Sequence, residues 1–366
     1  YNSAGTIVGF TNIDGSGNDA GFSITTDSAR NMYVTGYYSS STTVQVNNLA
    51  LNSTPVSSGY TLPLTNTTSN ALFILKYNSA GILISFTRFD GSGNDVGQGI
   101  AVDSAGNVYV TGYYVSSTTT QLNNFALSST PINSGYTFPI STSNASYIIK
   151  YDSNGTLAAF TVLDGSLIDS GYAITTDTVG NIYISGYYTS TTTVQVNNLT
   201  LSSTPVNSGY TLPLSNAGNN SAYIIKYGNV QNIQLTLPDP RLQTLSGFGV
   251  FDSPGSDIPP SNTVVCDGSN VYIAGYYTST TTVQINNLAL NSTPQSSGYT
   301  LPAVSGNGIF ILKYNSAGTI VGFTNIDGSG NDQPYSVCLD YLGNFYISGY
   351  YNSTTTVQIN NLALNS

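Results

Sequence analysis

One passage occurs twice in this chain without a single change, and it constrains the fold more than any other feature. Residues 1–19 read YNSAGTIVGFTNIDGSGND, and residues 314–332 repeat them letter for letter. Weaker copies begin at Tyr77, Tyr151 and Tyr227. A tandem repeat of this length indicates one supersecondary unit that packs against copies of itself. The sequence therefore predicts a single repeat domain over residues 1–366, with repeats at 1–76, 77–150, 151–226, an irregular 227–313 and a truncated 314–366.

The composition favours an all-β protein with few charges. Only 7% of the residues are charged, against roughly a quarter in an ordinary soluble domain. Asn, Ser, Thr, Gly and 29 Tyr dominate, and these residue types favour strands and turns. A net charge of −10 argues against a nucleic-acid groove, which needs clustered Lys and Arg. No apolar run approaches the roughly 20 residues of a membrane span, so none is expected.

Each repeat reads as a series of short strands and turns. In the second copy, residues 99–103 form an apolar strand, and residues 108–114 alternate as a half-buried strand does. In the first copy, residues 44–51 are predicted to form a hairpin around Asn47 and Asn48, because adjacent Asn residues tolerate positive φ. The segment with Pro55 and Pro63 is predicted to be a loop. The last two strands are expected at residues 72–77 and 82–89.

Four core strands and an extra hairpin in each repeat predict a β-propeller of four-stranded antiparallel blades, about five in this chain. An open β-solenoid or linear array of the same sheets is the alternative. Residues 6–13 lack the apolar strand that precedes this segment in later copies, and residues 335–366 begin a blade without finishing it. We therefore expect the amino-terminal strand to share a sheet with the last copy.

Three segments also carry a resemblance to a known family. They are DSAGNVYVTGYY from Asp103, FILKYNSAG from Phe73 and DGSGNDVGQGIAVD from Asp90. Together they resemble the bacterial β-propeller repeat family called SBBP. The resemblance implies a propeller that is usually secreted or surface-attached, and it implies no single activity, since propellers host many functions. The chain departs from the family in a longer Thr-Pro to Leu-Pro loop and in the irregular residues 227–260.

The acidic residues, all of them Asp, follow the repeat. Pairs five residues apart recur on a glycine-rich loop, at Asp14 and Asp19, Asp90 and Asp95, Asp164 and Asp169, Asp252 and Asp257, and Asp327 and Asp332. These pairs are interpreted as turn caps, with Ca²⁺ binding as the alternative because the loop offers several hard oxygen ligands. A further column is predicted to open tight turns by accepting backbone N–H bonds, at Asp27, Asp103, Asp177, Asp267 and Asp340.

The residues for nucleophilic catalysis are missing. Without His there is no Ser-His-Asp triad and no His-ligated zinc. Cys266 and Cys338 are predicted to be buried free thiols, with a disulfide or a metal pair as the alternative. In each of the first four repeats, one Lys ends an apolar strand. These lysines are interpreted as partners of an Asp that recurs in every repeat, or as edge residues, and they are Lys76, Lys150, Lys226 and Lys313. No cofactor is required, apart from the possible Ca²⁺.

Tyrosine forms two further columns. A Gly-Tyr-Tyr triplet ends one strand of every copy, at Tyr37 and Tyr38, Tyr113 and Tyr114, Tyr187 and Tyr188, Tyr276 and Tyr277, and Tyr350 and Tyr351. Ser-Gly-Tyr recurs in the long loop, at Tyr60, Tyr136, Tyr210 and Tyr299. The favoured interpretation is packing between blades. The alternative is recognition, since Tyr suits sugar stacking and protein interfaces.

Possible N-glycosylation sequons occur at Asn52, Asn66, Asn144, Asn154, Asn198, Asn219, Asn291 and Asn352, and they matter only in a glycosylating compartment. The leading hypothesis for function is a non-enzymatic structural protein, extracellular or on the surface of a cell or virus particle. It would self-assemble as a homo-oligomer or filament. The alternative is a lectin-like propeller that binds glycans through its tyrosines. A third hypothesis is a glycoside hydrolase or lyase that uses two carboxylates.

Overall fold

The computed structural model describes residues 4–63, 69–213, 219–229, 243–260 and 262–364. All regular secondary structure in these ranges is β-strand, so the predicted all-β class is confirmed. No helix in the described ranges has the length and apolar character needed for a membrane crossing.

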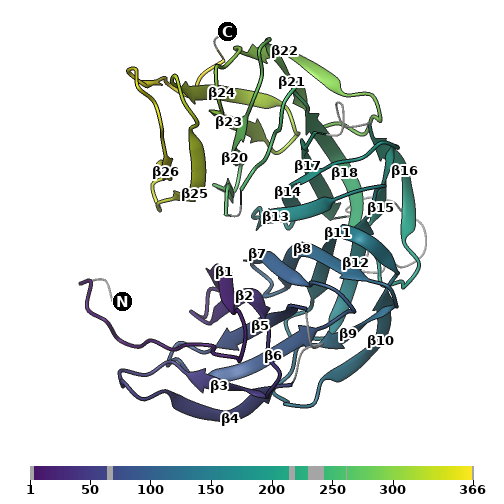
Figure 1. The fold of residues 1–366 in the computed structure, drawn as a ribbon, viewed down its shortest axis with the longest axis vertical. Helices are drawn as coiled ribbons and strands as arrows, with labels where there is room; N and C mark the ends of the chain where they lie inside the picture. Colours follow the sequence, from purple (N-terminus) through teal and green to yellow (C-terminus); the bar gives the residue numbers. More distant parts are fainter. Residues whose placement is uncertain (1–3, 64–68, 214–218, 230–242, 261, 365–366) are drawn as a thin grey trace. The chain divides into compact units, whose positions relative to one another are not determined.

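The repeats build four sheets on one antiparallel plan (Figure 1). The first sheet has the order β1 (Ala20–Thr26), β2 (Met32–Tyr38), β5 (Ala71–Tyr77), β6 (Leu83–Phe89). The second has β7 (Val96–Val102), β8 (Val108–Ser116), β11 (Ser141–Tyr151), β12 (Leu157–Leu163). The third has β13 (Asp169–Thr176), β14 (Ile182–Tyr188), β17 (Ser221–Asn229), β18 (Gln243–Phe251). The fourth has β19 (Val264–Cys266), β20 (Asn270–Tyr277), β23 (Gly308–Asn315), β24 (Ile320–Asp327), β27 (Gln358–Ile359).

The fifth copy contributes a sheet of two strands, β25 (Gln333–Leu339) and β26 (Phe345–Tyr350). Each of the first four copies also has a separate two-stranded hairpin, which we call the repeat hairpin. These hairpins are β3 (Val44–Asn48) with β4 (Val56–Leu62), β9 (Thr120–Asn124) with β10 (Ile132–Phe138), β15 (Val194–Asn198) with β16 (Val206–Leu212), and β21 (Val283–Asn287) with β22 (Gln295–Leu301).

The chain divides into two compact units. The first consists of residues 1–142, 149–160 and 201–204, and the second of residues 143–148, 161–200 and 205–366. In the first unit, side chains of β2, β5 and β6 pack against the repeat hairpin, with Phe73, Leu75, Val44 and Val46 in one buried cluster. β5 lies between β2 and β6, and nearly all of its residues are buried. Because both faces of this strand are covered, its sequence is a continuous apolar run.

Steric crowding by the neighbouring strand explains the glycine of the Gly-Tyr-Tyr triplet. A Cβ on Gly36 would lie 1.9 Å from the carbonyl oxygen of Ala20 in the neighbouring strand, so only glycine permits this close pairing. The register shifts there, between Gly21 and Ser23, as it does in a β-bulge.

The predicted hairpin at residues 44–51 is wrong. Val44 pairs with Leu62 and Asn48 with Val56, so the second strand is the segment that was expected to be a loop. Pro55 and Pro63 flank β4 instead of interrupting it, which is why the prolines do not prevent pairing. Asn47 and Asn48 are strand residues, and Ala50 forms a bridge with Phe10.

The expected sharing of a sheet between the two ends of the chain is not observed. Among the described residues, the sheet of the last copy contains β25 and β26 only, and Phe10 bridges to Ala50 of its own repeat. The same bridge joins Phe86 to Ala126 and Phe323 to Ala363. Residues 6–13 therefore use the edge contact that belongs to the repeat template.

Candidate functional site

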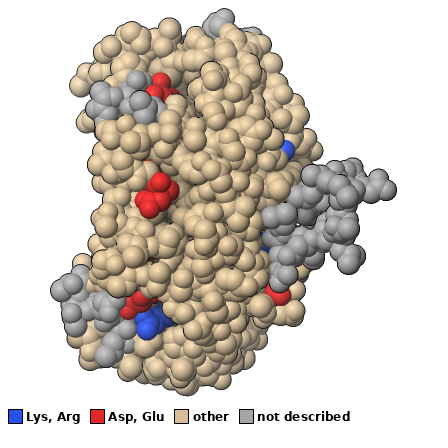
Figure 2. Space-filling view, turned by 90° about the vertical axis from the view of Figure 1, so that its right-hand side faces the viewer, with Lys and Arg blue, Asp and Glu red and all other residues tan. Residues whose placement is uncertain are grey.

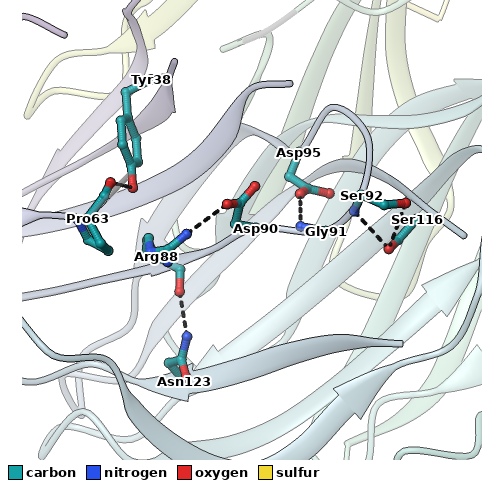
Figure 3. Close-up of polar contacts among 9 residues, drawn as sticks. All are labelled: Tyr38, Pro63, Arg88, Asp90, Gly91, Ser92, Asp95, Ser116 and Asn123. Atoms are coloured by element: carbon teal, nitrogen blue, oxygen red, sulfur yellow. Dashed lines mark hydrogen bonds and ion pairs between the residues drawn. The ribbon is translucent and has the colours of Figure 1, made fainter. Parts of the chain in front are cut away.

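The paired aspartates lie on loops that are closed by their own carboxyl groups. Asp95 accepts a hydrogen bond from the backbone N–H of Gly91 (Figure 3). Asp169 does the same with Gly165, and Asp19 accepts from Gly15 at 2.5 Å. This is a turn-capping role, in which a side-chain oxygen satisfies a backbone donor of its own loop.

The same loops are tied to the end of the neighbouring strand. The N–H of Ser92 donates to Ser116 Oγ at 3.0 Å (Figure 3). In the first copy, the second oxygen of Asp19 accepts from the N–H of Ser39 at 3.0 Å. The second Asp of a pair thus joins its own loop to the residue that follows a Gly-Tyr-Tyr triplet, which explains its place in the template.

Burial changes the protonation of these carboxyls. Asp95, Asp169 and Asp257 are completely buried. Desolvation by burial, with a smaller effect of the neighbouring first Asp, raises the pKa of each to about 8. These groups are therefore mainly protonated at neutral pH. One oxygen of Asp95 and one of Asp169 have no hydrogen-bond partner in the described part of the chain.

The second copy departs from the template at Arg88. Its Nη1 lies 2.9 Å from Oδ2 of Asp90, the sole ion pair among the described residues (Figure 3). The equivalent residues in the other copies are uncharged, namely Asn12, Val162, Val250 and Asn325. The side chain of Asp90 is 9% exposed, so this carboxylate is neutralised and largely shielded. Neither carboxyl of this pair is presented to a substrate as a glycosidase carboxylate would be.

The residues described in the structure contain no group of three or more Cys and Asp side chains that would hold a metal ion. The Ca²⁺ hypothesis for the Asp pairs therefore rests on the composition of the loop alone. The two cysteines are free. Their predicted burial is wrong, because Cys266 is half-buried and Cys338 is exposed on the outward-facing side of β25.

The single Asp column caps turns, as predicted. Asp27 accepts from the N–H of Asn31 at 2.8 Å and from the hydroxyl of Tyr33 at 3.0 Å. Lys76 lies over the ring of Tyr33, with Nζ 5.0 Å from its centroid, a cation–π contact. The same arrangement recurs with Asp103, Tyr109 and Lys150, with Asp177, Tyr183 and Lys226, and with Asp267, Tyr272 and Lys313.

The tyrosine columns are used mainly for packing. The second Tyr of the triplet is completely buried at Tyr38, Tyr114, Tyr188 and Tyr277. The long-loop tyrosines are half-buried, each with its ring against a Phe ring, at Tyr60, Tyr136, Tyr210 and Tyr299. The first Tyr of the triplet is half-buried at Tyr37, Tyr113, Tyr187 and Tyr276. In the described ranges, only Tyr350 and Tyr351 of these columns are exposed, at 37% and 71%.

The sequons differ in their accessibility. Asn52, Asn154, Asn291 and Asn352 are exposed, and Asn144, Asn198 and Asn219 are half-buried. Asn66 lies outside the described residues. The carboxamide of Asn198 accepts the N–H of Leu245 at 3.1 Å, and that of Asn219 donates to the carbonyl of Pro254 at 2.9 Å. A glycan on either amide nitrogen would disturb these contacts, so the exposed sequons are the better acceptors.

Sequence reasoning missed the role of the Asn-Asn pair in the repeat hairpin. Asn197 Nδ2 donates to the carbonyl of Val162 in β12 at 2.9 Å. Its neighbour Asn198 accepts the N–H of Leu245 in β18. The two side chains of one dipeptide thus reach the outer strands of two successive sheets. Asn123 with Asn124 and Asn286 with Asn287 make the equivalent bonds.

Successive repeat hairpins are also linked to each other. The N–H of Thr61 donates to Ser129 Oγ in the next hairpin at 2.9 Å. Thr137 with Ser203 and Thr211 with Ser292 repeat this bond. The recurrence of Ser-Thr-Pro after each Asn-Asn pair was the available sequence signal.

The outward side of each repeat hairpin is uncharged and carries exposed apolar side chains among Asn, Ser and Thr. Residues 44–63, 120–139, 194–213 and 283–302 contain no Asp, Lys or Arg. Solvent-exposed apolar side chains recur there, at Leu51, Val56, Leu127, Ile132, Val206 and Leu290. Figure 2 shows a face on which charged side chains form a few small, separate patches.

Comparison with known proteins identifies the repeat. Residues 84–113, which span most of β6, the Asp90–Asp95 loop, β7 and most of β8, match the family model described as Beta-propeller repeat, SBBP. The second copy of the repeat is thus similar to a β-propeller repeat. The chain is also 26% identical over 273 residues to an uncharacterized WD repeat-containing protein, L264, of Acanthamoeba polyphaga mimivirus. That match covers 71% of this chain and 18% of the relative, so the chain spans less than a fifth of the relative's length.

Proposed function

We propose that this chain is a non-enzymatic repeat scaffold that associates with further copies of itself through the repeat hairpins. The observation that carries the proposal is their outward surface. It is free of charge in every copy, and Leu51, the most exposed of its apolar residues, is 69% exposed. Charged residues on exposed strands normally prevent association between edges. Their absence from the same place in four copies favours a contact surface.

The repetition of the surface also supports assembly. Similar patches on successive repeats allow several weak contacts to form together, which raises the overall affinity. Contacts between unlike surfaces of successive copies extend into a filament when their rotation does not close a ring. We place the scaffold outside the cell or on the surface of a cell or virus particle. The support for this part is the charge-poor composition and the exposed sequons.

The test introduces charge on the hairpins. In the variant Val56→Lys/Ile132→Lys/Val206→Lys, each lysine replaces an exposed side chain. Light scattering and sedimentation across a concentration series should show association of the unmodified chain and loss of association in the variant. Electron microscopy would distinguish filaments from closed oligomers.

A matched control carries the same added charge elsewhere. Ala105→Lys/Val179→Lys/Leu342→Lys places three lysines at equivalent exposed turn positions away from the hairpins. It should associate like the unmodified chain. An unmodified chain that stays monomeric at high concentration would contradict the proposal, as would a hairpin variant that still assembles with an unchanged melting temperature.

A further inference from the structure

A cavity in the first unit is lined by side chains of both charges. It has a volume of about 260 Å³ and is bordered by Lys76 of β5, by Ser85 of β6 and by Asp152 in the turn after β11. The residues that line it all belong to the first unit. β5, β6, β8 and β11 are paired in complete four-stranded sheets, so the cavity is a feature of finished repeats. We call it the charged cavity.

Asp152 of the charged cavity departs from the repeat. Its Oδ1 accepts the N–H groups of Asn154 and Thr156 at 3.0 and 2.8 Å, and Oδ1 of Asn78 caps its own turn in the same way. An amide is thus sufficient to hold this turn. Oδ2 of Asp152 accepts no hydrogen bond from the described residues. The negative charge is therefore additional to what the turn requires, and it is absent from the equivalent Asn78, Gly228 and Asn315.

Ser85 is a second departure in the same cavity. It lies opposite Lys76 in the pairing of β5 with β6, so the two side chains are on one face of the sheet. Its hydroxyl oxygen is buried and has no hydrogen-bond partner in the described part of the chain. Since a buried hydroxyl normally has such a partner, we expect the partner in the cavity. The equivalent residues have no polar side chain, namely Gly9, Ala159, Gly247 and Gly322.

Lys76 keeps its ammonium group available to the cavity. In the described ranges, Nζ of Lys76 makes no hydrogen bond and no ion pair, and it lies 5.0 Å from the centroid of the Tyr33 ring. The equivalent Lys226 of the second unit donates instead to the carbonyl of Ser316 at 2.6 Å. Ser316 has the position of Ser153 in its turn. A lysine at this position can thus bond the turn directly, whereas Lys76 and residues 152–155 border a cavity.

We propose that the charged cavity binds a free α-amino acid with a small apolar side chain. The carboxylate of the amino acid accepts hydrogen bonds from Lys76 Nζ and the Ser85 hydroxyl, and its ammonium group donates to Oδ2 of Asp152. Opposite charges supplied by two sheets select a ligand that carries both charges. A ligand with one charge would leave the other charged side chain without a partner, which lowers its affinity.

The remaining walls suit a small apolar side chain. Ile84, Val108 and Phe125 also line the cavity, and Val108 and Phe125 are 2% and 4% exposed. The cavity is smaller than the roughly 300–1,000 Å³ of a site for a drug-sized ligand. Because Ser85 and Asp152 each occur in one copy of the repeat, we expect one site in each chain.

The first test compares ligands on the unmodified chain. Isothermal titration calorimetry with L-leucine should show saturable binding at one site per chain. 4-Methylpentanoate lacks the ammonium group and 3-methylbutylamine lacks the carboxylate, so each should bind at least about tenfold more weakly, because a charge-assisted hydrogen bond is lost. No saturable binding of L-leucine, or equal binding of either analogue, would overturn the proposal. Saturable binding of D-glucose in place of L-leucine would assign the cavity to saccharides and overturn it equally.

The second test restores residues that other copies carry. Asp152→Asn keeps the oxygen that caps the turn, and Ser85→Ala introduces the residue found at Ala159, so both variants should fold with little change in melting temperature. Asp152→Asn and Lys76→Met should each weaken L-leucine binding by about tenfold or more, and Ser85→Ala should weaken it less. Lys313→Met removes the equivalent lysine of another repeat and should leave binding unchanged.

Binding of L-leucine that Asp152→Asn leaves unchanged would overturn the proposal, as would a loss of equal size in Lys313→Met. The three-lysine hairpin variant should bind L-leucine like the unmodified chain. Binding at the charged cavity is therefore independent of association through the repeat hairpins.

Discussion

At the scale of single residues, the buried second Asp of each pair has a consequence for stability. Asp95 closes its loop through Gly91 and lies beside Asp90, whose charge is neutralised by Arg88. Among the described residues no cation is paired with Asp95, so its carboxyl is more stable without a charge. A neutral carboxyl can donate one hydrogen bond as well as accept, which suits a site between two loops.

The melting temperature should therefore fall as the pH rises. The pKa of Asp95, Asp169 and Asp257 is raised to about 8 in the folded chain, from an ordinary value of 3.8. A carboxyl that binds its proton more tightly when folded contributes stability fully below the unfolded pKa and loses it as the pH rises through the folded pKa. We expect a decrease of several degrees between pH 5 and pH 9, measured by calorimetry at constant ionic strength.

Asn is a neutral replacement that keeps an oxygen to accept the backbone N–H. The variant Asp95→Asn/Asp169→Asn/Asp257→Asn should flatten the pH dependence, whereas Asp14→Asn, at an exposed position, should retain it. A triple variant with the same slope as the unmodified chain would show that other groups cause the dependence.

At the scale of elements, the Asn-Asn pair holds the repeat hairpin against two sheets. Asn197 is 7% exposed and bonds the Val162 carbonyl. Asn197→Ala leaves that carbonyl unpaired, and a lost buried hydrogen bond of this kind costs about 1–3 kcal/mol in the free energy of unfolding. Urea unfolding followed by circular dichroism would measure it.

Asn154→Ala is the control, since Asn154 is exposed on a turn. It should change the free energy of unfolding by less than about 0.5 kcal/mol. Equal effects of the two substitutions would argue that the hairpin is held by its apolar contacts alone.

The strands that pack on both faces were predictable, and the hairpin was not. The apolar run of residues 72–77 and the alternating pattern of residues 108–114 each predict a strand. These segments form nearly all of β5 and most of β8. Asn47 and Asn48 have the residue types of a tight turn, but their side chains are needed between sheets, so tertiary contacts override local turn preference. Sequence spacing alone does not reveal such long-range partners.

In the candidate site, too, sequence reasoning predicted local contacts and missed long-range ones. The repeat columns gave the turn-capping Asp27 and its equivalents, because that role depends on residues four positions away. Burial of Asp95 and exposure of Cys338 depend instead on how strands of different sheets cover one another. The packing of Tyr60 against Phe86 is likewise a contact between distant segments.

At the scale of the whole molecule, the repeats present strands of nearly the same sequence. The sequence of one strand therefore does not specify which of the similar strands it pairs with. β2, β14 and β20 end in Gly-Tyr-Tyr, and β8 contains the same triplet two residues before its end. Each of them pairs with a strand that has Lys-Tyr at or near its end. Pairing β2 with β11 instead of β5 would close a loop roughly three times longer, which costs only about 1 kcal/mol. The correct partner is thus favoured mainly because it is synthesised first and lies nearest along the chain. Refolding from denaturant should accordingly yield strand-exchanged dimers, and their fraction, measured by size-exclusion chromatography, should rise with protein concentration.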